Sequence, residues 1–143
     1  MDETTADSPS HLFVYGTLRS DAGGEMHRRL MHGVRFAGRA SIGGRMYDAG
    51  WHPSAVPSAD PAERIAGELY AIDPDAAEAL FATLDEYEGY DAAHPAASPF
   101  VRRAVEAVRE DGTRVATWVY FCNEPVDGLP RITSGDWIGG RAG

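Results

Sequence analysis

The first apolar run of the chain is short and stops at a glycine. Residues 11–15 read His-Leu-Phe-Val-Tyr, and Gly16 follows. A short run of aromatic and β-branched residues that ends at a turn residue is typical of a buried strand. We therefore predict a first strand over residues 12–15, followed by a sharp turn at Gly16.

Two later regions show the same strand pattern. Between residues 34 and 72, short segments punctuated by Gly and Pro occur at residues 34–40, 45–47, 54–56 and 65–72. They predict strands joined by turns and, together, a mostly antiparallel sheet. Further along, residues 101–109 and 113–121 flank Glu110-Asp111-Gly112. Because Asp-Gly between two strand-like runs favours a tight turn, these runs are predicted to form a β-hairpin.

Helical patterns occur twice. Residues 25–33 place Met26 and Leu30 four apart and close on a glycine, which predicts a short helix. A clearer helix begins at Asp73, since its side chain can cap free backbone amides and the proline that follows suits the first helical position. We expect this helix to extend to about Tyr87.

The ends of the chain lack such patterns. Residues 1–10 are polar and acidic and are predicted to form a disordered leader. The last 22 positions hold two Pro and five Gly, so the tail is expected to pack as an irregular strap. With 143 residues, of which 43% are hydrophobic, the remaining residues 11–143 are expected to form one domain.

One carboxylate falls on the apolar face of the clearer helix. Four residues at helical spacing form a core-facing stripe, namely Ala77, Leu80, Phe81 and Leu84. At about 100° per residue, Glu88 continues this stripe, whereas Glu86 lies opposite it and Asp85 lies toward its flank. An inward carboxyl group has a pKa above its usual value of about 4.3, which suits a general base. Alternatively, the helix ends earlier and Gly89 lets Glu88 turn to solvent.

Further candidates are a turn, several aromatic residues and the arginines. The turn of residues 14–19, Val-Tyr-Gly-Thr-Leu-Arg, either forms an anion-binding nest of backbone amides or is a simple turn. The aromatic residues Tyr90, Phe100 and Tyr120 either line a cavity or belong to the core. The pairs Arg28-Arg29 and Arg102-Arg103 are interpreted as solvated charges.

Composition removes several classes of function. The 22 acidic residues outnumber 13 basic ones, and the net charge of −9 disfavours nucleic acid and anionic membranes as partners. All basic residues are Arg, so lysine chemistry is absent. A single cysteine, Cys122, forms no intrachain disulfide, and we expect a cytoplasmic protein. The histidines show no metal-ligand spacing, no nucleophile elbow is present, and no run approaches the roughly 18 apolar residues of a membrane span.

Two motifs together resemble those of a known superfamily. Tyr15, Gly16, Thr17 and Leu18 follow the first strand, and Leu-Asp-Glu-Tyr-Glu-Gly at residues 84–89 follows about seventy residues later. With Gly-Glu-Leu-Tyr at 67–70 and Ser-Gly-Asp-Trp at 134–137, the chain resembles the γ-glutamyl cyclotransferase-like superfamily, above all its γ-glutamylamine cyclotransferase branch. The resemblance implies an α+β fold, small and mixed, with a mostly antiparallel β-barrel-like core and few helices.

The resemblance also implies a reaction and its residues. Glu88 would be the general acid/base, the segment Tyr15 to Leu18 would hold the γ-glutamyl group through backbone amides, and Tyr120 would line the cavity. The substrate would be a small γ-glutamyl molecule, with no cofactor and no metal. Thr17-Leu18 departs from the Ser-Asn of the glutathione-type and free γ-glutamyl-amino-acid branches, which favours an amine or a peptide side chain as the leaving group. A noncatalytic binding domain, and an enzyme that removes a γ-glutamyl protecting group from a biosynthetic intermediate, remain alternatives.

Overall fold

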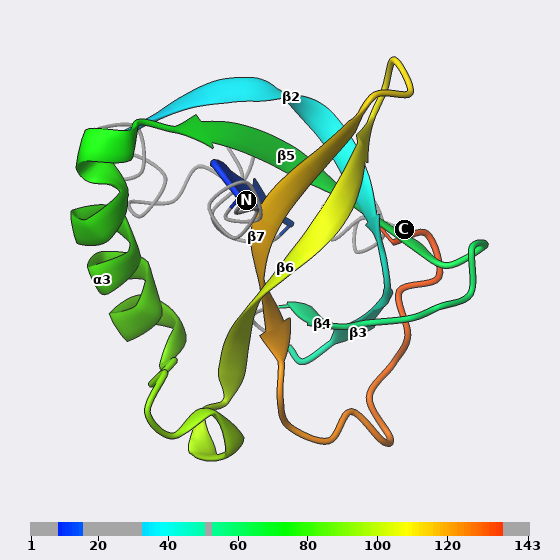
Figure 1. The fold of residues 1–143 in the computed structure, drawn as a ribbon. Coiled ribbons are helices and arrows are strands. Elements are labelled where there is room, and N and C mark those ends of the chain that lie inside the picture. The colour runs from blue at the N-terminus through cyan, green and yellow to red at the C-terminus, as the bar shows by residue number, and fades with distance from the viewer. Residues whose placement is uncertain (1–8, 16–32, 51–52, 136–143) are drawn as a thin grey trace.

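Five strands of the protein close into a barrel. The computed structural model describes residues 9–15, 33–50 and 53–135. Around the barrel the strands follow the order β1-β5-β2-β6-β7 (Figure 1), and a two-stranded sheet, β3-β4, lies beside it. The strands are β1 (His11–Val14), β2 (Val34–Gly43), β3 (Arg45–Asp48), β4 (Pro53–Val56), β5 (Arg64–Ile72), β6 (Phe100–Arg109) and β7 (Arg114–Cys122). The predicted α+β fold with a barrel core is confirmed.

The pairing of the strands is almost wholly antiparallel. Among the described barrel pairs, β1 with β7 is the single parallel one, with Leu12 opposite Trp118. The predicted hairpin is confirmed as β6 and β7, with Gly112 in its turn at φ +91°. The long strand β2 exceeds its prediction by three residues, because residues 41–43 continue to pair with residues 64–66 of β5. A bulge interrupts the register of β2 between Phe36 and Gly38.

One long helix stands beside the barrel. A short 3-10 turn, η2 (Pro74–Ala76), leads into α3 (Ala77–Glu88), and a second turn, η3 (Pro95–Ala97), follows it. Asp73 caps this start as predicted, since its carboxylate accepts a bond from the backbone of Asp75. The predicted helix at residues 25–33 lies outside the described residues except for Gly33, as do residues 1–8 of the predicted leader.

The chain after β7 is irregular in its described part, residues 123–135, as predicted. Its contacts run back across the barrel. The backbone of Ile132 bonds to Met46, and Gly135 accepts a bond from Ala66 on β5. Arg131 also forms a 2.9 Å ion pair with Glu63. This segment therefore acts as the expected strap.

The strands of one wall are buried on both faces. A first core cluster draws on all five barrel strands and includes Phe13, while a second gathers Leu12, Val14 and Tyr120 with Leu84 of α3. Since successive side chains of a strand point to opposite faces, β1 sends alternate residues into the barrel and toward the helix. The predicted apolar stripe of α3 covers this outer face.

Candidate active site

Glu88 is the last residue of α3. Gly89 then adopts a left-handed conformation, with φ 77° and ψ 25°. Its N–H bonds back to the carbonyl of Glu86, and the N–H of Tyr90 bonds to that of Asp85 at 2.8 Å. These two bonds form a Schellman motif, in which a glycine ends the helix. The helix therefore includes Glu88, contrary to the alternative that it ends earlier.

The carboxyl group of Glu88 lies in an environment that disfavours its charge. The side chain is largely buried, and no described residue forms a hydrogen bond or ion pair with it. Burial raises the pKa of Glu88 from 4.5 to about 7. Desolvation disfavours the charged form of an acid, and here nothing in the described part of the chain offsets it. The side chain is therefore turned inward, as expected, and its burial raises its pKa.

Glu88 lies near two buried tyrosines at the ends of β1 and β7. Burial raises the pKa of Tyr15 and of Tyr120, and the negative charge of Glu88 adds to both shifts. The hydroxyl of Tyr15 donates a 2.5 Å hydrogen bond to the backbone carbonyl of Tyr120. The ends of these two parallel strands and the end of α3 therefore meet in one place.

Only part of the predicted substrate-binding segment is described. Tyr15 is buried, and its hydroxyl is bound within the protein rather than free. Gly16, Thr17 and Leu18 lie outside the described residues. Their binding role stays a prediction, and what the structure adds is that the strand leading to them ends beside Glu88.

Tyr120 and Asp85 belong to a polar network next to Glu88. The Tyr120 hydroxyl donates a 2.6 Å bond to Oδ1 of Asp85. The guanidinium of Arg102 donates two hydrogen bonds to the same carboxylate, from Nε to Oδ1 at 3.0 Å and from a terminal nitrogen to Oδ2 at 3.1 Å. The interpretation of Arg102 as a solvated charge is therefore wrong, whereas its neighbour Arg103 is exposed as expected.

Strand register and aromatic packing explain the burial of Arg102. It pairs directly with Tyr120 across β6 and β7, so both side chains point toward α3. Its guanidinium lies 4.3 Å from the ring centroid of Phe81 and 4.8 Å from that of Trp118. The sequence contained a usable signal, because the hairpin turn fixes this register and Asp85 lies on the flank of the helix. The aromatic residues Tyr90 and Phe100 pack against the core.

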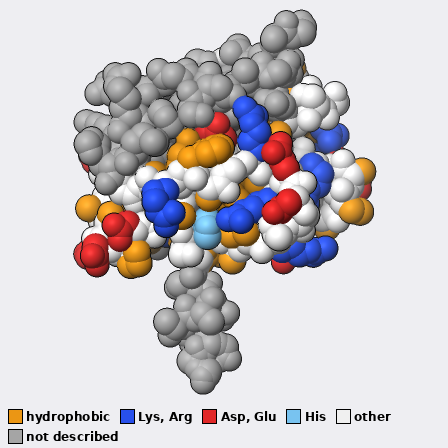
Figure 2. All heavy atoms as spheres, turned by 90° about the horizontal axis from the view of Figure 1, so that it is seen from above, with side chains coloured by type: hydrophobic (Ala, Val, Ile, Leu, Met, Phe, Trp, Pro, Cys, Tyr) orange, Lys and Arg blue, Asp and Glu red, His pale blue; other side chains and the backbone are white. Residues whose placement is uncertain are grey.

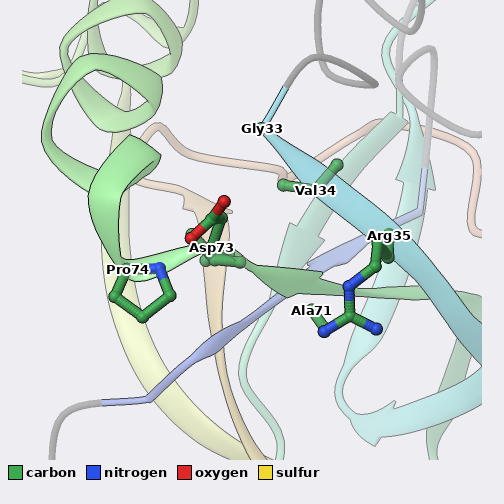
Figure 3. Close-up of a pocket in the computed structure, with 7 residues that line it drawn as sticks. Gly33, Val34, Arg35, Ala71, Asp73 and Pro74 are labelled. Carbon is green, nitrogen blue, oxygen red and sulfur yellow. The ribbon is translucent and has the colours of Figure 1, made fainter.

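A pocket lies at the other end of α3. It is an open hollow of about 390 Å³ formed by the start of β2, the end of β5 and the cap of the helix (Figure 3). Arg35 and Asp73 supply its charged groups. The 12 residues of α3 separate this pocket from Glu88 by about 18 Å at 1.5 Å per residue. It is therefore not the site built around Glu88.

The described residues offer neither a metal site nor a membrane-spanning helix. Across residues 9–15, 33–50 and 53–135, no group of three His, Cys, Asp or Glu side chains is arranged to hold a metal ion. Within those ranges, no helix combines the length and the apolar character needed to cross a membrane. On the face seen in Figure 2, arginine and acidic side chains are interspersed among the described residues.

Comparisons with known proteins identify a family and relatives to which the chain is similar. The model of the family "Gamma-glutamyl cyclotransferase, AIG2-like" matches residues 12–139. The gamma-glutamylcyclotransferase family protein YtfP of Escherichia coli K12 is 32% identical over 128 residues, 89% of this chain and 95% of that protein.

Two solved structures share the fold. An AIG2-like protein from Mus musculus has a TM-score of 0.65 at 26% identity, with 86% of this chain and 85% of that chain covered. The uncharacterized protein PH0828 from Pyrococcus horikoshii has a TM-score of 0.60 at 26% identity, with 92% of each chain covered. The resemblance found in the sequence is confirmed, and the chain belongs to the γ-glutamyl cyclotransferase, AIG2-like family of cyclotransferase-like enzymes.

Proposed function

We propose that this chain is a cofactor-free γ-glutamyl cyclotransferase that acts in the cytoplasm. It converts a γ-glutamylamine or γ-glutamyl amino acid into 5-oxoproline and a free amine. Members of its family act on small γ-glutamyl substrates. The observation that supports the proposal most is Glu88, a largely buried carboxyl group with a pKa of about 7 at the meeting point of α3, β1 and β7.

The reaction needs proton transfer rather than a protein nucleophile. Glu88 removes a proton from the substrate's α-ammonium, and the freed amine attacks the γ-carbonyl carbon of the same molecule. A carbon–nitrogen bond forms and closes a five-membered ring, while the bond from that carbon to the leaving nitrogen breaks. Glu88 delivers this proton to the leaving nitrogen, which departs as the amine. The ring nitrogen loses its second proton as it becomes an amide, and the released amine takes up that proton to leave as an ammonium ion. Because attack is intramolecular, proximity supplies much of the rate.

Glu88 has the ionisation that this role requires. A general base works best when its pKa lies near the operating pH, and burial raises the pKa of Glu88 to about 7. The nearby phenols are poorer candidates, because burial raises their pKa values and their protons are bound by the carbonyl of Tyr120 and by Asp85. In the described part of the site, Glu88 is therefore the group that can exchange a proton near neutral pH.

The turn after β1 would supply substrate binding. Backbone amides of Gly16, Thr17 and Leu18 would hold the γ-glutamyl group and stabilise the oxyanion that develops on its carbonyl oxygen. These residues carry the family motif, and β1 ends beside Glu88. Thr17-Leu18 favours a γ-glutamylamine over glutathione as the substrate.

The test is release of 5-oxoproline from a panel of γ-glutamyl amines, γ-glutamyl dipeptides and glutathione. Wild type is compared with Glu88→Gln, which keeps the shape of the side chain but cannot exchange the proton. Glu86→Gln is the matched control, because Glu86 lies exposed on the same helical turn. We expect turnover of at least one panel member, abolished by Glu88→Gln and retained by Glu86→Gln.

Two results would contradict the proposal. Full activity of Glu88→Gln would show that Glu88 is not the general acid/base. Absence of turnover on every panel member, with ligand binding retained, would favour the alternatives of a protecting-group-removing enzyme or a binding domain.

A further inference from the structure

Arg102 connects the barrel to the helix that carries Glu88. It lies on β6, and its side chain is 19% exposed, while that of Asp85 on α3 is 22% exposed. The two bonds of the guanidinium to Asp85 run in parallel, a geometry that fixes orientation as well as distance. The rings of Phe81 and Trp118 lie within 5 Å of the guanidinium carbon and restrict its movement further.

The last turn of α3 depends on Asp85 for its attachment. The apolar stripe of the helix ends at Leu84, and the two residues after Asp85, Glu86 and Tyr87, are exposed. Asp85 precedes Glu88 by three residues, which places both on neighbouring positions of one turn. Its side chain binds Arg102 and Tyr120, and its carbonyl accepts the bond from Tyr90 that closes the helix.

We propose that Arg102 is a positioning residue, which acts through Asp85 to hold the last turn of α3 against β6 and β7 and so keeps the Glu88 carboxyl in its buried place. The consequence for catalysis rests on the proposed function. The geometric claim does not, because the burial of Glu88 can be measured without substrate.

A positioning role and a purely electrostatic role of Arg102 predict opposite changes in the pKa of Glu88 when Arg102 is removed. The ionisable groups around Glu88 are Asp85 on its own helix, Tyr120 and Cys122 on β7 and Tyr15 at the end of β1. Arg102 on β6 lies beside Asp85, Tyr120 and Tyr90. If Arg102 acted only by its charge, its loss would leave Asp85 unpaired and raise the pKa of Glu88. If Arg102 holds the turn, its loss exposes Glu88 to water and lowers that pKa toward 4.5.

The experiment is a carboxyl-carbon NMR titration of Glu88 in the full-length chain. The main variant is Asp85→Asn/Arg102→Met, which removes both charges together and keeps an oxygen for the Tyr120 hydroxyl. Arg114→Met is the matched control, because Arg114 lies in the same hairpin and pairs with Glu106 at 3.0 Å, but with side chains that are 70% and 57% exposed.

We expect the pKa of Glu88 to fall by about one unit or more in the double variant and to stay unchanged in the control. An unchanged or higher pKa of Glu88 in the folded double variant would overturn the proposal. If that variant does not fold, Arg102→Lys replaces it, because lysine keeps the charge without the planar fork. A lower pKa of Glu88 in Arg102→Lys supports positioning, and an unchanged one overturns it.

Kinetics separate this inference from the proposed function. With an active wild type, we expect the double variant to lose about tenfold or more in kcat, with a smaller change in KM, and the acid limb of its pH profile to move to lower pH. If the wild type releases no 5-oxoproline yet the titration shifts as expected, the proposed function fails and the positioning role stands. If the wild type is active and the titration does not shift, the proposed function stands and the positioning role fails.

Discussion

The hydroxyl of Tyr120 donates a 2.6 Å hydrogen bond to Oδ1 of Asp85, which joins the last strand of the barrel to the last turn of the helix. Directly opposite Tyr120 on β6, Arg102 binds both oxygens of the same carboxylate. A cross-strand pair thus converges on one acid of the helix. The acid three residues later, Glu88, has no such partner in the described structure and a pKa near 7. Two carboxyl groups on one turn therefore lie in different environments, one paired with Arg102 and Tyr120 and one largely buried with a raised pKa.

Tyr120→Phe is expected to destabilise the fold modestly. The ring stays in the outer core, but Asp85 loses one of its hydrogen bonds, and a bond to a charged acceptor contributes about 1.5 to 3 kcal/mol. Because Arg102 still binds Asp85, we expect a loss near the lower end, about 1.5 kcal/mol, in urea denaturation. In a double-mutant cycle with Asp85→Ala, which removes the acceptor of this bond, the two losses should not add. Additive losses would indicate that the hydroxyl does not stabilise the protein through Asp85.

The rate of the proposed reaction should depend on pH through Glu88. A general base must be ionised, and burial raises the pKa of this carboxyl to about 7. We therefore expect kcat/KM for a γ-glutamylamine to rise with pH and to level off above about pH 7. A profile that is already flat at about pH 5.5 would show that the essential base has an ordinary carboxyl pKa.

Glu88→Gln should stabilise the protein at alkaline pH. The pKa of Glu88 is raised in the folded state, so the folded protein binds more protons than the unfolded chain between about pH 4.5 and 7. Stability therefore falls as pH rises through this window, and a shift of about 2.5 units corresponds to about 3 kcal/mol above it. Glutamine carries no charge to desolvate.

Chemical denaturation at about pH 8 and about pH 5.5 measures this effect. The variant should exceed wild type by about 2 to 3 kcal/mol at the higher pH and by clearly less at the lower one. Glu86→Gln serves as the control, since Glu86 is exposed. Equal stability of wild type and Glu88→Gln at both pH values would mean that the carboxyl is solvated.

Local pattern was enough to predict most elements of the fold. The short apolar run at residues 11–15 and the stripe of α3 each indicate which side chains a strand or helix buries, and both patterns are local. The same stripe predicted the inward position of Glu88, and this prediction succeeded because the helix continues regularly to Gly89. The predictions that succeeded depended on residues within one element or one turn.

Arg102 could not be identified in the same way. Its role depends on Asp85, which lies 17 residues away on another element, and on the rings of Phe81 and Trp118. An arginine in a strand is usually solvated, and only tertiary packing makes this one a buried partner. The register of the hairpin predicts that Arg102 lies opposite Tyr120. The local sequence does not show how close the hairpin packs to the helix, so it does not predict the contact of Arg102 with Asp85.

Gly67→Ala should disrupt the wall of the barrel that leads to the candidate site. Gly67 lies on β5, and an added Cβ would stand 2.3 Å from the carbonyl oxygen of Val14 and 2.6 Å from the ring of Phe13. The carbonyl belongs to the backbone of β1, so relief requires the strand itself to move. Overpacking typically lowers the free energy of unfolding by about 1–3 kcal/mol. Because the clash here is with backbone, we expect Gly67→Ala to lower it by about 3 kcal/mol or more.

Gly43→Ala on β2 is the matched control, because its Cβ would come no closer than 3.2 Å to the nearest backbone atom, the carbonyl oxygen of Ser58. Urea denaturation of both variants measures the difference. Since β1 ends at the turn that would bind the γ-glutamyl group, Gly67→Ala should also weaken substrate affinity in whatever fraction remains folded. Equal stability of the two alanine variants would mean that the backbones of β1 and β5 are far enough apart at Gly67 to accommodate a Cβ atom.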